Sequence, residues 1–483
     1  MEPVFAFPIV LPPRGSRLRL RSLHEQLRAA IAEGRLQPGL RMPGTREVAA
    51  AYGISRNTAL AAYDLLLSEG YLVTRPRSGA FVAAAVPRRR VAPDPALDDG
   101  ADRRLNAFWR APPAFMPAAM RVTSTIDFRL GVADKGLFPF DTWRRLAARA
   151  TRAYAGEPAV YGSAQGRPAL REAIAQHVAF ARAVVCRPDD VVVTSGSQQA
   201  FDLLARILVT PGRTVVAVEN PGYPPLRAVL AGLGAKIAPV PTDAEGMIVD
   251  RIPADAKVVC VTPSHQFPLG TALSMQRRAA LLDFARRRGA VVLEDDYDGE
   301  FGYRSRPLDA MQSLDSTGCV FYVGTFTKTL FPGMRLGFVV APPWARRALV
   351  HAKLCADMHC SVIEQETLAA FIADGHMARH VRRMRRVYAS RRGVLLDGLH
   401  AAFGRWLQPV PSYAGLHVSA LARAGVNTDA IAARARDADV GVYSLRPYCL
   451  AGRPRHGLLF GYGAIDEAQI REGLRRLRPL FAS

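Results

Sequence analysis

The sequence predicts a multidomain protein with an N-terminal winged helix-turn-helix, an α/β layer built on a mostly parallel sheet, and a smaller C-terminal α+β lobe. Three observations predict this organisation. The 483 residues exceed the usual size of one compact domain. Residues 14–83 show helical periodicity followed by two short β runs. From residue 126, apolar strand-like runs alternate with helical segments for about 220 residues, which is typical of a parallel sheet with crossover helices.

The N-terminal segment 14–83 is expected to form three helices and a hairpin. Its first helix has apolar residues at i, i+4, i+7 and i+8, so they share one helical face. A second short helix, "TREVAAAY", and a third, "RNTALAAYDLLLSEG", are separated by a tight turn, and the runs "YLV" and "AFV" form the wing. The signals are Leu23, Leu27, Ala30 and Ile31 on the apolar face, Ser55 as the N-cap of the third helix, and Gly34, Gly53 and Gly70 as helix ends.

This order of elements is that of a DNA-binding motif whose third helix enters the major groove. Side chains at the helix starts and at the wing tip are the expected DNA contacts, and Ser55 would serve both as a cap and as a phosphate contact. Any one of them could be an ordinary surface residue, but their clustering favours DNA. The candidates are Arg46, Ser55, Arg56, Asn57, Thr58, Arg75, Arg77 and Gly79.

Residues 84–125 are expected to be a linker, because "VPRRRVAPDPALDDGADRR" and "RAPPAFMP" mix prolines with charges and lack periodicity. The triplet Arg88–Arg90 could contact DNA phosphates or could be solvated. Residues 126–483 are expected to form the larger domain, with the small lobe from about residue 358. Its buried-strand runs are "VVVTSG", "TVVAVENPGY", "KVVCVTP", "AVVLEDDYD", "CVFYVGTFTK" and "LGFVVAP", and ligands bind at the carboxyl ends of such strands.

Composition excludes some classes of protein. No apolar run approaches 18 residues, and the first 15 residues lack a basic start and a cleavage site, so we expect a cytoplasmic protein with no membrane partner. The six cysteines lack CxxC or metal-ligand spacing, which predicts reduced cysteines and no metal site. The net charge of +22 is spread along the chain: residues 16–82 hold ten Arg and five acids, net +5. Charge alone therefore supports nucleic-acid binding only weakly.

Lys328 stands out in "GTFTKTLFPGMRLGF". Only five of the 64 basic residues are lysines, yet one lies just after a strand, between hydroxyl residues, with Arg335 seven residues later. A lysine can lose its proton and form a Schiff base with an aldehyde, which arginine cannot do. Arg335 can hold a phosphate, as can the helix start at "SGSQQAF". The acids of "EDDYD" suit a pyridine nitrogen. Together these groups predict a pyridoxal phosphate site.

These motifs are similar to those of two known protein families. From Ile126 to Ser483 the chain resembles a fold-type-I aminotransferase, and from Leu20 to Val82 it resembles a GntR-type winged helix. The two in this order resemble the MocR family of transcription regulators. The motifs "MPGTRE", "VTPSHQFPLG", "LEDDYDGEF" and "GTFTKTLFPGMRLGF" carry the match, which covers nearly the whole chain.

The resemblance implies a role for each site residue. Lys328 would bind the cofactor covalently, Asp295 would pair with the pyridine nitrogen, Tyr297 would bond the phenolic oxygen, and Tyr223 would stack on the ring. Asp296 could instead take the role of Asp295. The residues expected around the phosphate are Ser197, Gln198, Thr325, Thr327 and Arg335. Further candidates are His265 and Gln266 beside the ring, Arg446 for an amino acid's carboxylate, and Tyr161, which would reach a neighbouring subunit in a homodimer.

Three functions compete: a transcription regulator that senses a small molecule, an active aminotransferase with an accessory DNA-binding module, and a DNA-binding protein that has lost the cofactor. The complete set of cofactor residues argues against the third, and the well-formed winged helix argues against the second. We therefore expect a regulator that binds promoter DNA and senses pyridoxal phosphate or its amino acid adduct. Relatives that respond to γ-aminobutyrate carry an arginine two residues after the stacking tyrosine, where this chain has Pro225. Arg227 is expected to point elsewhere.

Overall fold

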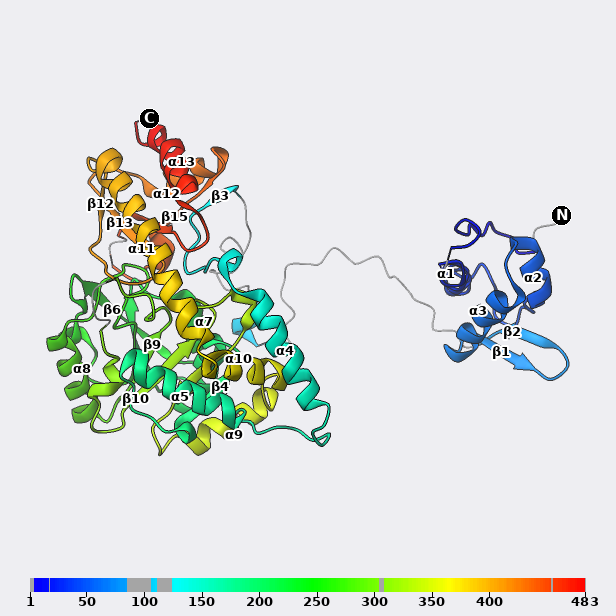
Figure 1. Cartoon of the computed structure of the whole chain (residues 1–483), viewed down its shortest axis with the longest axis horizontal. Helices are drawn as coiled ribbons and strands as arrows, with labels where there is room; N and C mark the ends of the chain where they lie inside the picture. Colours follow the sequence, from blue (N-terminus) through cyan, green and yellow to red (C-terminus); the bar gives the residue numbers. More distant parts are fainter. Residues whose placement is uncertain are drawn as a thin grey trace. The chain divides into compact units, whose positions relative to one another are not determined.

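The computed structural model describes residues 4–16, 18–84, 106–110, 124–303, 308–452 and 455–482. Contacts divide the chain into two compact units, Met1–Asp102 and Arg103–Ser483 (Figure 1). Most of the expected linker, with Arg88–Arg90, lies outside the described residues. Within the described ranges, no helix is both long enough and apolar enough to cross a bilayer.

The first unit has the predicted winged helix-turn-helix. Helix α1 buries the predicted apolar face of Leu23, Leu27, Ala30 and Ile31 against the other two helices. The turn between the second and third helices depends on a glycine with φ of +58°, Gly53, and on the Ser55 side chain, which accepts a hydrogen bond from Thr58 N at 3.0 Å. The elements are α1 (Arg19–Ala32), α2 (Thr45–Tyr52), α3 (Arg56–Ser68), β1 (Leu72–Arg75) and β2 (Gly79–Val82).

The second unit is built on an eight-stranded sheet with the order β4-β11-β10-β9-β8-β5-β6-β7. The central strands are parallel, whereas β11 and β7 run antiparallel to their neighbours. The strands are β4 (Val191–Thr194), β5 (Val215–Asn220), β6 (Lys236–Asp243), β7 (Gly246–Met247), β8 (Ala256–Val261), β9 (Val291–Asp296), β10 (Val320–Thr325) and β11 (Gly337–Val340). Each of the six predicted strand runs is a strand, and β6 and β7 are additional.

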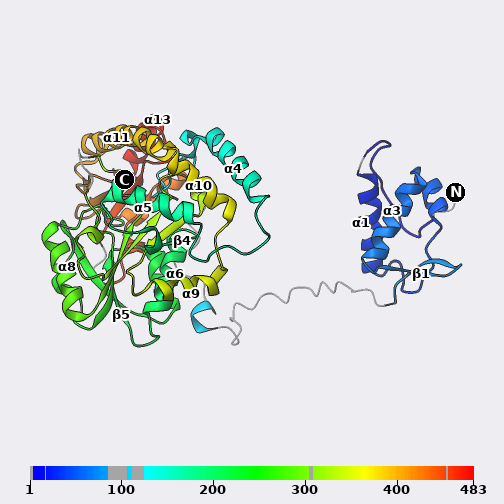
Figure 2. The same cartoon turned by 60° about the horizontal axis from the view of Figure 1, so that its bottom comes forward.

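Helices cover both faces of this sheet (Figures 1 and 2). One face packs on α6, α7 and α9, and the other packs on α5, α8 and α10, with α4 outside α10. Alternate strand residues point to opposite faces, so both faces are apolar, as expected for a parallel sheet. The helices are α4 (Phe140–Tyr154), α5 (Pro168–Arg182), α6 (Ser197–Leu208), α7 (Pro224–Gly232), α8 (Met275–Arg288), α9 (Arg346–Asp357) and α10 (Val362–Ala373).

The C-terminal lobe has a four-stranded antiparallel sheet with the order β12-β13-β16-β15 and its own core. Helix α11 joins this lobe to the larger one, because Val381 packs in the core with α4 and α10 whereas Leu395 packs in the C-terminal core. The elements are β3 (Ile126–Asp127), α11 (His376–Phe403), β12 (Leu407–Pro409), β13 (His417–Ala422), α12 (Thr428–Asp437), β14 (Val440–Gly441), β15 (Tyr443–Ser444), β16 (Gly457–Gly461) and α13 (Glu467–Leu477).

Two short connections matter for the site. Strand β3 pairs with β14, so the chain segment that opens the larger domain lies in the C-terminal lobe. The 3-10 helix η1 (Ala107–Arg110), within the expected linker, packs on α7 through Phe108 and Trp109, which approach Gly232. Further 3-10 helices are η3 (Lys135–Leu137), η4 (Pro188–Asp190), η5 (Val249–Arg251), η6 (Met311–Leu314), η7 (Pro332–Met334), η8 (Arg446–Tyr448) and η9 (Arg478–Phe481).

Candidate functional site

Lys328 lies just beyond the carboxyl end of β10, at the junction of the two lobes of the larger unit. Its Nζ lies against Gly131, where a Cβ atom would come within 3.0 Å of the amine. Gly131 has φ of +60°, so this close approach of backbone to amine needs glycine. Burial lowers the pKa of the Lys328 amine, and the nearby carboxylates of Asp298 and Asp295 oppose that shift.

Two adjacent acids at the end of β9, Asp295 and Asp296, point to opposite sides of the strand. Only one of the two carboxylates is therefore available to a ligand. Asp296 accepts hydrogen bonds from Arg182 Nε at 2.6 Å and from the Tyr322 hydroxyl at 2.7 Å, so its charge is paired. Asp295 is buried, and its Oδ1 has no hydrogen-bond partner. Burial and the neighbouring carboxylates raise the pKa of Asp295, with Lys328 opposing. Asp295 is therefore the acid available to a ligand.

Tyr297 and His265 form a buried group with Asp298. The Tyr297 hydroxyl donates to the carbonyl of His265 at 3.0 Å and lies 2.9 Å from His265 Nδ1. That nitrogen also lies 3.0 Å from Asp298 Oδ2, which fits an N–H donated to the carboxylate. His265 Nε2 has no partner. Asp298 is the fourth acid of the same "EDDYD" run, but the sequence alone gave it no role.

His417 completes this group from β13, with its ring centroid 4.7 Å from that of His265. His265, Asp298 and His417 have the spacing of a metal-binding trio. However, His265 Nδ1 is already occupied by Asp298, and His417 Nε2 lies 2.7 Å from the Pro268 carbonyl. A metal ion would have to displace one of these contacts. No local sequence pattern could have found His417, which is far from the other two residues in the chain.

The turn from β4 to α6 forms a cradle for an anion. The backbone N–H groups of Ser197 and Gln198 begin α6, and Arg335 Nη2 donates to the Ser195 carbonyl at 3.0 Å. A Cβ atom on Gly196, which has φ of +79°, would come within 3.0 Å of the Arg335 guanidinium. Thr327 Oγ1 is buried without a partner, and Thr327 N donates to Thr325 Oγ1 at 3.2 Å. These elements bring the predicted phosphate residues to one edge of the sheet.

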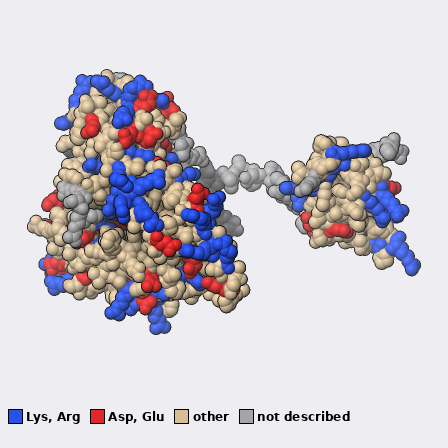
Figure 3. Space-filling model, in the orientation of Figure 1, with Lys and Arg blue, Asp and Glu red and all other residues tan. Residues whose placement is uncertain are grey.

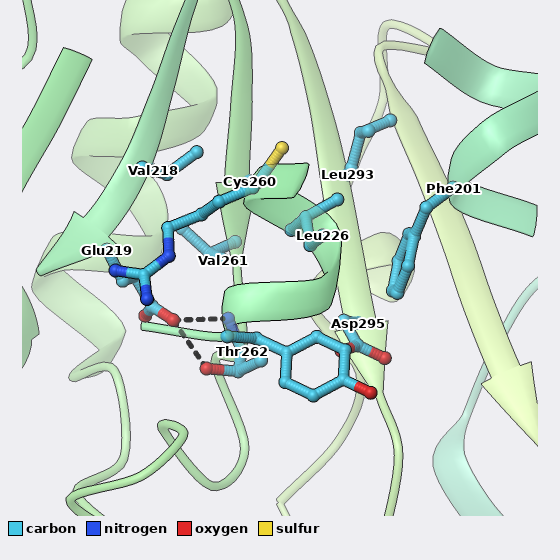
Figure 4. A pocket seen from close by; sticks show the side chains of 11 residues that line it. Phe201, Val218, Glu219, Leu226, Cys260, Val261, Thr262, Leu293 and Asp295 are labelled. Carbon is cyan, nitrogen blue, oxygen red and sulfur yellow. Dashed lines mark hydrogen bonds between the residues drawn. The ribbon is translucent and has the colours of Figure 1, made fainter. Parts of the chain in front are cut away.

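A small cavity of about 20 Å³ lies beside Asp295 (Figure 4). Tyr223 lines it and also packs edge-on against Phe267, with ring centroids 5.4 Å apart. The buried Glu219 accepts hydrogen bonds from Thr262 N and Thr262 Oγ1, drawn as dashed lines in Figure 4, and burial raises the pKa of Glu219 to about 7. A cavity of this size holds one water molecule.

Arg227 also lines this cavity. It lies in the first turn of α7, and its Nη1 donates to the Tyr448 carbonyl at 2.9 Å. The helix does turn Arg227 away from the position of Pro225, but the η8 loop folds back over α7 and its carbonyls draw the guanidinium to the cavity. Sequence periodicity cannot show a contact between segments more than 200 residues apart.

Two expected effector residues do not join the cofactor group. Arg446 has a side chain that is 63 % exposed, and its Nη1 is paired with Asp429 Oδ2 at 3.0 Å. Tyr161 is 78 % exposed, and its ring centroid lies 6.2 Å from that of His359. It lies in an exposed segment with Tyr154 and Val160.

The expected DNA contacts lie on the surface of the first unit. Arg46, Arg56 and Asn57 are exposed at the starts of α2 and α3, where Ser55 and Thr58 hydrogen-bond each other. In the wing, Arg75 stacks over the Phe81 ring at 4.5 Å and is paired in register with Gly79. Arg77 is exposed at the tip.

The family model "Aminotransferase class I and II" matches residues 128–477, and "Bacterial regulatory proteins, gntR family" matches residues 20–82. The chain is 37 % identical to the probable rhizopine catabolism regulatory protein MocR of Rhizobium meliloti, covering 95 % of this chain and 93 % of that one. It is 34 % identical to the transcriptional regulator TauR of Rhodobacter capsulatus, covering 97 % of each.

A solved structure supports the fold of the larger unit. The α-aminoadipate aminotransferase LysN of Thermus thermophilus, complexed with N-(5'-phosphopyridoxyl)-L-leucine, superposes with a TM-score of 0.70 at 27 % identity. The superposition covers 76 % of this chain and 95 % of that one.

The residues present fit pyridoxal phosphate. Asp295 Oδ1 and Thr327 Oγ1 are buried polar atoms without partners, and the Gly196 turn with Arg335 leaves an anion cradle. Together with the family match, this indicates the cofactor that the sequence predicts. The chain belongs to the aminotransferase class I and II family and, through its N-terminal gntR unit and full-length relatives, to the MocR-type transcription regulators.

Proposed function

We propose that this protein is a cytoplasmic regulator that binds promoter DNA through its winged helix and senses pyridoxal phosphate, or an amino acid joined to it, in the larger unit. One observation carries the proposal. A single chain combines an exposed winged helix with a half-buried lysine, an unpartnered aspartate and an anion cradle, as a sensor requires. An aminotransferase has no use for the winged helix.

When bound, pyridoxal phosphate supplies an aldehyde, a phosphate and a pyridine nitrogen. We assign Lys328 to the aldehyde, because its lowered pKa favours the uncharged, nucleophilic amine. Asp295 Oδ1, buried and unpartnered, would accept the N–H of the ring nitrogen. Burial and the neighbouring carboxylates raise the pKa of Asp295, so a protonated ring nitrogen would stabilise its charged form.

The other assigned residues hold the ring and the phosphate. Tyr223 would stack on the ring, and the Tyr297 hydroxyl, which His265 positions, would bond the ring oxygen. Thr325, Thr327 and Arg335 would bind phosphate oxygens together with the first N–H groups of α6. Arginine suits this position because its fork can donate two hydrogen bonds to a phosphate.

An amino acid effector would compete for Arg446. The pair between Arg446 and Asp429 is exposed, and such pairs are weak, so a carboxylate can displace Asp429. This exchange would alter α12 and η8 in the C-terminal lobe, and η8 contacts Arg227 in α7. Helix α7 also holds Phe108 and Trp109 of the chain that leads from the DNA-binding unit. These contacts link the proposed effector site to residues 106–110, which belong to the expected linker.

Replacing Lys328 should remove the covalent cofactor. We expect the purified protein to be yellow and to yield a borohydride-fixed adduct on Lys328, and Lys328→Ala to yield none, because Lys328 is the lysine that lies beside Asp295. Mass spectrometry of the reduced, digested protein measures this. Lys236→Ala, at an exposed lysine, is the control and should keep the adduct. An unchanged adduct in Lys328→Ala would assign the cofactor to another lysine.

Arg56→Ala should weaken binding to the upstream promoter region. A lost contact to a base or phosphate at the start of α3 costs on the order of 1–3 kcal/mol. Gel-shift titrations at several salt concentrations measure the change. Arg28→Ala, at an exposed arginine of α1 away from the turn and the wing, should bind as the wild type does. Equal affinity for Arg56→Ala and wild type would remove Arg56 from the interface.

The protein should be a homodimer in solution. Exposed aromatic and aliphatic side chains in the Tyr154–Tyr161 segment suit burial by a second copy, and winged helices bind paired half-sites. Light scattering should give twice the 52.5 kDa chain mass. A monomer that still holds pyridoxal phosphate would contradict this arrangement.

Ligand state should change DNA affinity. A ligand can shift the DNA-binding equilibrium only as far as it binds one conformation more tightly than another. We expect promoter affinity to differ among the apo protein, the cofactor-loaded protein and the loaded protein with an amino acid from a test panel. Absorbance and gel shift are followed in one titration. Identical affinity in all three states, with rapid keto acid production, would favour the aminotransferase instead.

A further inference from the structure

The first half of α11 holds seven arginines between residues 379 and 392, and the structure divides them into two groups. Three of these arginines bind groups of neighbouring segments of the same unit. Arg385 Nε donates to the Glu300 carbonyl at 2.5 Å, Arg391 Nη2 binds Asp134 Oδ2 at 2.7 Å, and Arg392 donates to the Ser412 carbonyl. These three side chains tie α11 to its neighbours and are not available to a partner.

The other four, Arg379, Arg382, Arg383 and Arg386, are exposed. Their spacing of i, i+3, i+4 and i+7 puts them on one stripe about 10 Å long. We call this stripe the α11 basic face. Arg379 donates to the Asp374 carbonyl at 2.9 Å. Arg382, Arg383 and Arg386 form no ion pair with any residue in the described ranges.

The exposed face of helix α8 has a different charge pattern. On α8, Arg286 and Arg287 both pair with Asp283, at 2.7 and 2.8 Å. On α11 the like charges at i and i+4 repel one another and no acid interrupts them, which destabilises the helix slightly. Solvation alone does not compensate for this repulsion between arginines. The pattern indicates an anionic partner.

The α11 basic face continues onto the neighbouring helix α4. Arg149 of α4 pairs with Asp374, at the turn before α11, at 3.1 Å, and Arg145 and Arg152 are exposed on α4. Figure 3 shows groups of Lys and Arg side chains over α11 and over α4 on one face of this unit. A surface of this kind, wider than one helix, suits an extended polyanion rather than a single small anion.

We propose that the α11 basic face binds backbone phosphates of double-stranded DNA that flanks the sequence contacted by the winged helix. The inference rests on the proposed DNA-binding function and extends it to the larger unit. Guanidinium groups form paired hydrogen bonds with phosphates, and such contacts do not depend on base sequence. DNA is the favoured polyanion because the winged helix of the same chain holds it at high local concentration.

The test compares two duplexes that contain the same operator, one covering only the operator and one extended by about 20 base pairs on each side. The wild type should bind the long duplex more tightly and with a steeper salt dependence. The full-length variant Arg382→Gln/Arg383→Gln/Arg386→Gln should lose this gain. The slope of log K against log salt should fall by about 0.9 for each lost phosphate contact, and binding to the short duplex should be unchanged.

A matched control distinguishes the effect of the α11 basic face from the effect of a lower net charge. Arg286→Gln/Arg287→Gln/Arg288→Gln on α8 removes the same charge from exposed positions and should keep the long-duplex gain. The proposal is overturned if the α8 control loses the long-duplex gain in affinity as fully as the α11 variant does. It is also overturned if the α11 variant keeps the same gain as the wild type. Neither outcome affects operator binding by the winged helix. Failure of the wild type to bind either duplex overturns both. The borohydride adduct and a dimer mass in the α11 variant show that it is folded.

Discussion

The buried ion pair between Arg182 and Asp296 determines the shape of the cofactor site. Arg182 ends α5, and it also donates to the Ser264 hydroxyl at 2.6 Å and to the Leu308 carbonyl. It thereby fixes the end of β9 and the loop that carries His265. Because side chains alternate along a strand, holding Asp296 on one side leaves Asp295 on the other. Removing one partner of such a buried pair costs about 3–5 kcal/mol, so the free carboxylate depends on the paired one.

The site lies where the two lobes of the larger unit meet. Lys328 and Asp295 come from strand ends of the large sheet, Gly131 from the segment after β3, and His417 from the small-lobe sheet. Helix α11 packs in both cores, and η8 binds Arg227 in α7. A ligand that changes contacts at this junction therefore acts on both lobes at once, which is the arrangement that ligand sensing needs.

Arginine serves three separate purposes in this chain. Arg182 and Arg278 are buried, with Arg278 Nη2 donating to the Pro263 carbonyl at 2.9 Å, and they hold loops in place. Arg335 lies at an anion cradle, while the α11 basic face is exposed. A net charge of +22 averages over these roles, which explains why charge alone predicted little about partners.

The sequence by itself determined the elements with strong local signals and the identity of the site chemistry. Helix caps, glycine ends and apolar runs predicted the winged helix and six strands, and the scarcity of lysine pointed to Lys328. Strand β6 was not predicted because Pro239 and Pro241 interrupt its pattern, yet it pairs with β5. Only the tertiary structure decided which acid is free, where Arg227 and Arg446 point, and that His417 joins His265. These outcomes depend on contacts between segments far apart in the chain, and local propensity carries no information about them.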